Sequence, residues 1–226
     1  GSIFYMKNLH ISVEILSRIL MPKYPIHLDA LLYAALKDNS DMDDDAVLEI
    51  LDRVLDKQDG VYKASAMRFL KSNHFPITDM EWTFATRTHW EEWEFSTKEK
   101  SKTIVTKGGG FRKRVTSHNG ILTHAVDFFA VGEPQHIHYL LKCLGFIGLN
   151  NNQGFGEIGE IDILEINQDF SFIDEQDELA RCLPINMVPE EIQNTVMQIT
   201  NSFKPPYKSS ERLLTYTPNF RTKHIF

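Results

Sequence analysis

One stretch decides the fold of this chain. It reads Leu144-Gly-Phe-Ile-Gly-Leu-Asn-Asn-Asn-Gln-Gly-Phe-Gly-Glu-Ile-Gly-Glu-Ile-Asp-Ile-Leu-Glu-Ile166, with five glycines within fifteen residues and three asparagines in the middle. Glycine and asparagine tolerate a positive φ and let the backbone approach a ligand closely. An apolar, helix-like stretch precedes the glycines and an alternating, strand-like stretch follows them. The stretch therefore predicts a helix–loop–strand unit, and the loop is suited to lie against a polyanion.

The residues before this unit predict a strand, two helices and further strands. Residues 9–15 alternate apolar and polar side chains with period two, which is typical of a half-buried strand. Residues 27–36 are rich in helix formers, and the acids from Asp43 to Asp45 can cap a second helix that ends at Asp59-Gly60. Residues 61–70 are then expected to form another strand.

The second half of the chain predicts a similar pattern. Residues 81–95 are rich in aromatic side chains and threonine, and residues 121–131 form an apolar run bounded by glycines; both favour strands. Pro134 suits the first turn of a helix that reaches Leu144. After the strand that ends at Ile166, Pro189 is expected to begin a short helix with Ile192, Val196 and Ile199 on one side.

This order of elements predicts an α+β fold. Strand, helices, strands, helix and strand is the order of a ferredoxin-like βαββαβ unit. We expect this domain to span residues 3–166, with a hairpin excursion at about 80–119 between its middle strands. Residues 167–226 are expected to form a C-terminal appendage that packs on the same core.

Composition indicates a globular protein. The chain has 226 residues, 42% of them hydrophobic, which can fill a sizeable core. No apolar run approaches the roughly 18 residues of a membrane span, so we expect no membrane contact. Cys143 and Cys182 lack metal-ligand spacing and are interpreted as reduced thiols of a cytoplasmic protein. No metal or other cofactor is expected.

Charge is distributed unevenly along the chain. The net charge of −7 argues against nucleic acid, but residues 29–59 alone carry ten acids and three bases. Residues 98–114 carry seven bases and one acid, and residues 202–226 carry five bases and one acid. Either basic segment can bind an anionic partner or simply form a solvated surface.

The glycines permit two interpretations besides a nucleotide cofactor. Residues 154–159 match GxGxxG, but a dinucleotide fold needs a strand before this motif and a helix after it, and here the order is reversed. A phosphodiester backbone can instead lie against the peptide N–H groups of such a loop. The alternative is a tight connection between helix and strand, with no ligand.

The basic excursion contains a combination that suits single-stranded nucleic acid. Its sequence, Lys107-Gly-Gly-Gly-Phe-Arg-Lys-Arg114, joins a glycine hinge to Phe111 and the cations Arg112, Lys113 and Arg114. Cations neutralise phosphates, and an aromatic ring can stack on a base. The competing interpretation is a solvated hairpin tip.

The histidines form no recognisable catalytic motif. His27 and Asp29, two residues apart at a helix start, are best interpreted as local hydrogen-bonding and capping groups. His136 and His138 face different sides of a helix, which is poor metal-binding geometry. A general acid–base role in RNA cleavage is conceivable for His118 and His124, which flank the basic region.

Four stretches together resemble a known family. They are the glycine-rich helix–loop–strand, Tyr24-Pro-Ile-His-Leu-Asp-Ala-Leu-Leu-Tyr33, Tyr62-Lys-Ala-Ser-Ala66, and Val131-Gly132 with the helix after it. Their order is similar to that in the RAMP superfamily of RNA-binding CRISPR-associated proteins, and most similar to the type IV subunit of the Cas-five kind. The resemblance covers roughly residues 9–166.

The resemblance implies a non-catalytic RNA-binding subunit of a CRISPR effector complex. Such a subunit grips the 5′ handle of the crRNA, contacts the backbone and large subunits, and helps to place the target DNA beside its flanking motif. Two alternatives stay open. One is a metal-independent endoribonuclease that processes precursor crRNA, with His118, His124 and Lys113 as candidate groups. The other is a protein-only interaction domain.

The implied RNA-binding residues lie in two segments. The glycine loop would cradle handle phosphates, and the excursion would act as a thumb-like hairpin that reaches RNA. The neutral tip, without the cations expected of such a loop, suggests hydrogen bonding there, with cations supplied from elsewhere. The candidate residues are Gly145, Gly148, Asn151, Asn152, Gln153, Gly154, Phe155 and Gly156 in the loop, and Lys107, Phe111, Arg112, Lys113 and Arg114 in the excursion.

Overall fold

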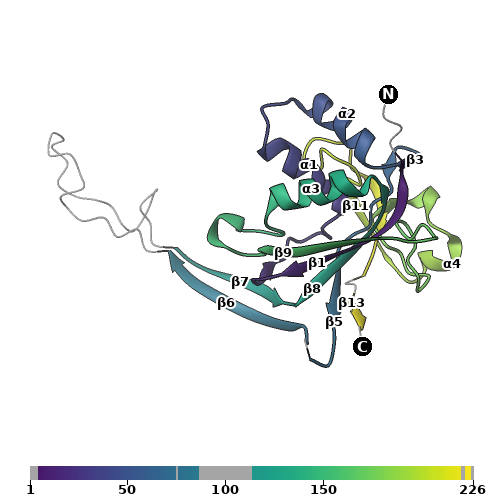
Figure 1. Cartoon of the computed structure of the whole chain (residues 1–226). Helices are drawn as coiled ribbons and strands as arrows, with labels where there is room; N and C mark the ends of the chain where they lie inside the picture. The colour runs from purple at the N-terminus through teal and green to yellow at the C-terminus, as the bar shows by residue number, and fades with distance from the viewer. Residues whose placement is uncertain (1–4, 75, 87–113, 220–221, 225–226) are drawn as a thin grey trace, which may run out of the picture.

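The computed structural model describes residues 5–74, 76–86, 114–219 and 222–224 (Figure 1). Its largest sheet has five strands in the order β13-β5-β8-β1-β9. Strand β1 lies between β8 and β9 and is antiparallel to both, and β13 runs parallel to β5. The bounds are β1 Lys7–Ile15, β5 Arg68–Lys71, β8 Ala125–Gly132, β9 Ile158–Glu165 and β13 Thr222–His224.

The sheet and its helices confirm the predicted α+β class. Helices α1 (Leu28–Asp38) and α2 (Asp44–Val54) lie between β1 and β5 in the chain, and α3 (Pro134–Leu144) lies between β8 and β9. The spatial order β9-β1-β8-β5 is compatible with a ferredoxin-like βαββαβ unit. All three helices lie on the same side of the sheet (Figure 1).

The main hydrophobic core lies between these helices and the sheet. The alternating side chains of β1 that were predicted to point inward, Leu9, Ile11, Val13 and Ile15, are all buried there. They pack with the apolar faces of α1, α2 and α3, which include Leu32, Leu51 and Leu141. The period-two pattern of β1 and the helical spacing of the covering elements therefore fix which faces meet.

The helix ends follow from local sequence. Asp43 caps α2, because its Oδ1 accepts the Ala46 N–H at 2.9 Å. Glu133 caps α3 by accepting the His136 N–H at 2.7 Å, and Pro134 occupies the first turn as predicted. Gly145 ends α3 in the left-handed region at φ 72°.

A long hairpin arm leaves the body between the middle strands of the sheet. Strand β6 (Thr78–Thr86) pairs with β7 (Arg114–Leu122), and the base of β7 pairs with short strand β2 (Ile19–Leu20). Figure 1 shows this arm projecting away from the helices and the main sheet. It is the predicted hairpin excursion, anchored through β2 to the turn that follows β1.

The C-terminal segment builds a second, smaller core. Its three-stranded sheet has the order β10-β12-β11, with β10 Leu183–Pro184, β11 Met197–Asn201 and β12 Leu213–Thr217. A separate cluster of buried side chains, including Leu183, Phe203 and Tyr216, fills it. Val61 from the first half of the chain belongs to this cluster, so the two parts of the chain share packing.

The remaining elements are short. They are the hairpin strands β3 (Lys57–Gln58) and β4 (Val61–Tyr62), the 3-10 turns η3 (Asn151–Gln153) and η4 (Ile185–Met187), and helix α4 (Glu190–Gln193). Among the described residues, no helix is both long and apolar enough to cross a bilayer.

Several sequence-based boundaries were wrong. Asp59-Gly60 does not end α2, which stops at Val54; it forms the turn of the β3–β4 hairpin, with both residues at positive φ. The strand expected at 61–70 is two strands, β4 and β5, and the one expected at 121–131 is interrupted between β7 and β8. The helix after Pro189 stops at Gln193, and Ile199 lies in β11, because pairing with β12 overrides local preference.

Candidate nucleic-acid interface

The glycine loop, residues 145–157, runs from the end of α3 to the start of β9 and is fastened to the β1–β2 turn. Four hydrogen bonds of 2.7–2.9 Å make this attachment, and they use backbone groups of the loop. They are Leu16 N–H to Glu157 O, Glu157 N–H to Ser17 Oγ, Gly156 N–H to Arg18 O, and Leu149 N–H to Leu20 O. The loop is therefore a fixed part of the fold.

Two of the predicted site glycines have a packing role. A Cβ placed on Gly156 would lie 1.8 Å from the carbonyl oxygen of Ile147, and one on Gly148 would lie 2.7 Å from that of Leu20. Both residues also have a positive φ, 71° and 102°. Only glycine fits at such positions. The alternative interpretation, a tight helix-to-strand connection, accounts for these two glycines.

The tip of the loop, residues 150–154, is presented to solvent. Asn150 enters it at φ 55°, and Asn152, Gln153 and Gly154 are exposed. The N–H groups of Gln153 and Gly154 donate to the carbonyls of Asn150 and Asn151, which closes the turn η3. The groups that this tip offers to a ligand are thus the amide side chains of Asn152 and Gln153.

The structure brings eight of the predicted site residues together in this loop. Gly145 forms the C-cap of α3, Asn151 lies in η3, and Phe155 is half-buried below the tip. Lys107, Phe111, Arg112 and Lys113 lie outside the described residues. Arg114 is the first residue of β7, where its backbone pairs with Thr86.

Two cations near the loop were missed by sequence reasoning. The Arg18 carbonyl accepts a hydrogen bond from the Gly156 N–H. The Cδ atom of the Arg18 side chain lies about 3.4 Å from the position that a Cβ would occupy at Gly120, in the arm. Arg18 therefore lies between the loop and the arm base. Lys142, in the last turn of α3, places its Nζ 3.4 Å from the Gly159 carbonyl. Neither belongs to a basic run, so only the three-dimensional attachment of the loop reveals them.

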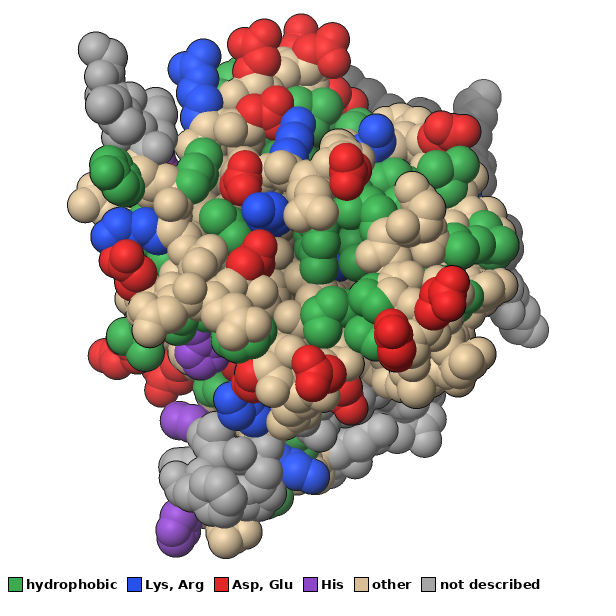
Figure 2. All heavy atoms as spheres, turned by 90° about the vertical axis from the view of Figure 1, so that its right-hand side faces the viewer, with side chains coloured by type: hydrophobic (Ala, Val, Ile, Leu, Met, Phe, Trp, Pro, Cys, Tyr) green, Lys and Arg blue, Asp and Glu red, His purple; other side chains and the backbone are tan. Residues whose placement is uncertain are grey.

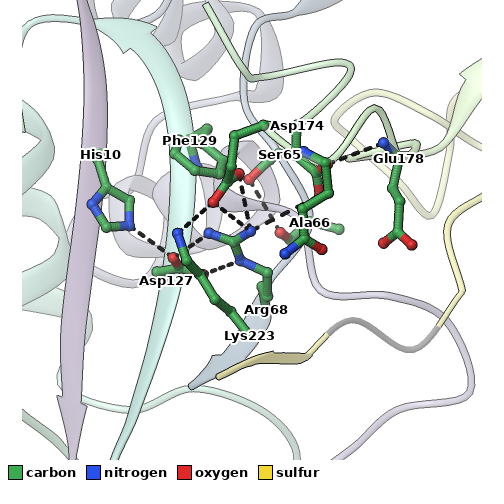
Figure 3. A network of polar contacts seen from close by, with 11 residues as sticks. His10, Ser65, Ala66, Arg68, Asp127, Phe129, Asp174, Glu178 and Lys223 are labelled. Carbon is green, nitrogen blue, oxygen red and sulfur yellow. Dashed lines mark hydrogen bonds and ion pairs between the residues drawn. The ribbon is translucent and has the colours of Figure 1, made fainter. Parts of the chain in front are cut away.

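The sheet face opposite the helices is largely closed by a polar network (Figure 3). Arg68 of β5 donates to both carboxylate oxygens of Asp127 of β8, at 2.9 and 2.7 Å, and to Glu175 at 3.0 Å. His10 of β1 lies 2.7 Å from Asp127, and Lys223 pairs with Glu175. The network ties the central strands to the C-terminal segment.

This closure excludes a stacking platform at the centre of the sheet. RNA-recognition sheets stack bases on aromatic side chains of their central strands. Here Phe129 of β8 is only 5% exposed, because His10 stacks on it at 5.0 Å, Phe170 meets it edge-on and the Arg68 guanidinium lies over its ring. A nucleic acid would have to use other surfaces, such as the loop and the arm.

His27 and Asp29 serve the structure as buried hydrogen-bonding groups. The Cys182 N–H lies 3.1 Å from His27 Nε2, and Asp29 pairs with the fully buried Arg181 and with Tyr207. Burial raises the pKa of the Tyr207 hydroxyl well above its ordinary value, so it stays protonated and donates to Asp29. These groups fasten the start of α1 to the C-terminal segment.

The other histidines form no joint site among the described residues. The His136 ring lies 2.6 Å from Glu133, the cap of its own helix, and His124 is exposed beside β8. The described residues contain no group of three or more histidine, cysteine or acidic side chains that could hold a metal ion. Of His118, in β7, the backbone alone is described.

Comparison with known proteins identifies the family. Residues 7–217 match the model of a family described as CRISPR type IV associated protein Csf3, while no curated protein matches the chain. The match covers nearly the whole fold, from β1 to β12. The type IV CRISPR association expected from the resemblance is confirmed, and it implies membership of a type IV CRISPR effector complex. The chain belongs to the Csf3 family of CRISPR type IV associated proteins.

Proposed function

We propose that this chain is a non-catalytic RNA-binding subunit that caps the 5′ handle of the crRNA in a type IV effector complex and contacts its backbone and large subunits. The observation that supports this most directly is the fixed glycine loop beside the base of a projecting arm. Both surfaces converge on the β1–β2 turn, so one RNA strand can touch both.

The loop and the arm divide the contacts in this proposal. The exposed amides of Asn152 and Gln153 can donate to and accept from phosphates, sugars or base edges, and they carry no charge. Arg18, Lys142 and the cations of residues 107–114 supply the charge. Because the loop is held by the fold, its tip loses little conformational freedom when RNA binds.

The first experiment measures crRNA retention in the assembled complex. Asn152→Ala with Gln153→Ala should weaken retention of a crRNA that carries its 5′ handle, and a handle-less guide should be unaffected. The matched control is Gln168→Ala with Asn194→Ala, two exposed amides outside the loop. Equal retention in both double variants would exclude a role for the loop tip.

The second experiment examines the arm. Arg112→Ala, Lys113→Ala and Arg114→Ala together should reduce guide RNA retention. The slope of log affinity against log salt should fall by about 2, since each lost phosphate contact on a single strand contributes about 0.7. An unchanged slope would favour a protein-only interaction domain.

A third experiment tests the absence of catalysis. The purified chain is incubated with a hairpin-bearing repeat RNA in the presence of a metal chelator, and we expect no specific cleavage. Specific cleavage that is lost in His118→Ala or His124→Ala would instead establish an endoribonuclease.

A further inference from the structure

A pocket of about 470 Å³ opens between segments that are distant in sequence, and Ile121 at the base of the arm contributes to its lining. Its walls are the loop at residues 21–26, the residues at and before β5, and one face of the C-terminal sheet. Most of its lining is apolar, including Met21, Met67, Phe69, Met197 and Ile199. Methionine side chains adapt to the shape of what they contact, which suits a pocket for a partner's side chain.

One wall of the pocket belongs to an edge strand. Met197 and Ile199 lie two residues apart on β11, so both point to the same face of the sheet. Within the described chain β11 pairs only with β12, and Met197 is 65% exposed. An edge strand presents unpaired N–H and C=O groups to which an extended peptide can add. Backbone pairing and a side-chain pocket therefore occur together.

The charge of the pocket differs from that of the chain. Among the residues that the structure describes, fifteen line the pocket, and they include no carboxylate and one cation, Lys23, although 31 of the 226 residues of the chain are acids. Lys23 is exposed, and its Nζ lies 5.6 Å from the centre of the Tyr24 ring. In the described part of the chain Lys23 makes no ion pair. The pocket thus suits an apolar group with a carboxylate beside it.

We propose that this pocket docks an extended segment of a partner polypeptide that places an apolar side chain in the pocket and an aspartate or glutamate against Lys23. A nucleobase fits less well, because its polar edge would meet mainly methionine, isoleucine, phenylalanine and proline side chains. The inference does not rest on RNA binding, which the handle experiments measure separately.

Photo-crosslinking in the assembled type IV complex identifies the occupant. Met197 is replaced by p-benzoylphenylalanine, and the control places the same group at Leu214, an apolar residue of β12 that is 47% exposed and outside the pocket. We expect position 197 to crosslink to a segment of another subunit that contains apolar and acidic residues. Crosslinks to RNA, to a second copy of this chain, or to no subunit would overturn the proposal.

A defined probe then tests the chemistry. Fluorescent peptides of alternating leucine and aspartate, or leucine and lysine, are titrated with the purified full chain. We expect the aspartate peptide to bind to the wild-type chain. Its affinity for Met197→Asp should be at least tenfold lower, and its affinity for Leu214→Asp should equal that for wild type. Lys23→Glu should reverse the preference toward the lysine peptide. No binding of the aspartate peptide, or equal binding by all variants, would contradict the proposal.

Discussion

Arg181 shows how much of this fold depends on one buried side chain. It is fully buried and donates to the carbonyls of Tyr62, Ala64 and Phe203 while pairing with Asp29. Removal of one partner from a buried ion pair costs about 3–5 kcal/mol, since the other charge is left without compensation. We therefore expect Arg181→Met to lower the free energy of unfolding by about that amount, measured by urea denaturation.

A control variant and a double variant show whether the loss of stability comes from the buried ion pair. Arg212→Met changes an exposed arginine and should alter stability by less than about 0.5 kcal/mol. Asp29→Leu combined with Arg181→Met should recover part of the loss, because no charge remains buried. If Arg181→Met is as stable as the Arg212→Met control, the network is not a major source of stability.

Asp127 gives the fold a specific sensitivity to acid. Although burial raises it, the hydrogen bonds from Arg68 and His10 hold the pKa of the Asp127 carboxyl below its ordinary value. The stabilisation is therefore present above the unfolded pKa of about 3.9 and disappears as the pH falls through the lower, folded pKa. Asp127→Asn should be less stable than wild type at pH 7, and the difference should shrink as the pH approaches 3.

Denaturant titrations between pH 7 and pH 3 measure this difference. The control is Asp41→Asn, which changes an exposed carboxylate. Its free energy of unfolding should change with pH in the same way as that of wild type. If the difference in free energy of unfolding between wild type and Asp127→Asn stayed constant over the whole pH range, ionisation of Asp127 would not contribute to stability.

At the scale of elements, two glycines of the loop allow the cost of backbone strain to be compared with the cost of a steric clash. Gly154 and Gly156 both have a positive φ, 83° and 71°, so an alanine at either position should cost about 1–2 kcal/mol of strain. A Cβ on Gly154 meets no atom within 4 Å, whereas one on Gly156 collides with the Ile147 carbonyl. We expect Gly156→Ala to be clearly less stable than Gly154→Ala in thermal unfolding; equal losses would mean that the loop moves freely.

Sequence patterns anticipated the elements that carry strong local signals. The alternation in β1, the cap at Asp43 and the limits of α3 at Pro134 and Leu144 all match the structure. These signals depend on neighbouring residues alone. The order of the elements then sufficed to predict the α+β class, and the observed strand order is compatible with the expected βαββαβ unit.

Other elements depend on partners that the sequence does not reveal. Ile199 has helix-compatible spacing but lies in β11, because its partner Thr215 is sixteen residues away and supplies the ladder. Arg18 looks like an ordinary residue of a turn, and only the attachment of the glycine loop to its carbonyl places it near the candidate site. Long-range strand pairing and burial thus determine the structure at positions where the local sequence pattern does not.

At the scale of the whole molecule, exposed carboxylates form a dense group over α2. Figure 2 shows carboxylates gathered at the upper end, where Figure 1 places α2, and this agrees with the exposed acids Asp43, Asp45 and Glu49. The glycine loop and the arm base have the cations Arg18 and Lys142 beside them, together with the carboxylates of Glu14 and Glu157. A net charge of −7 is therefore compatible with a local anion-binding surface, because fields of exposed charges are screened within about 10 Å at 0.1 M salt.

The two hydrophobic cores raise the question of whether the chain unfolds in one step. Val61 packs in the smaller core, Arg181 bonds to backbone on both sides, and β13 pairs with β5 of the main sheet. Because breaking either core exposes these shared contacts, we expect a single calorimetric transition with equal van't Hoff and calorimetric enthalpies. Arg181→Met should broaden or split it, whereas Arg212→Met should not. Two transitions in the wild-type chain would instead show that residues 167–226 unfold as a separate unit.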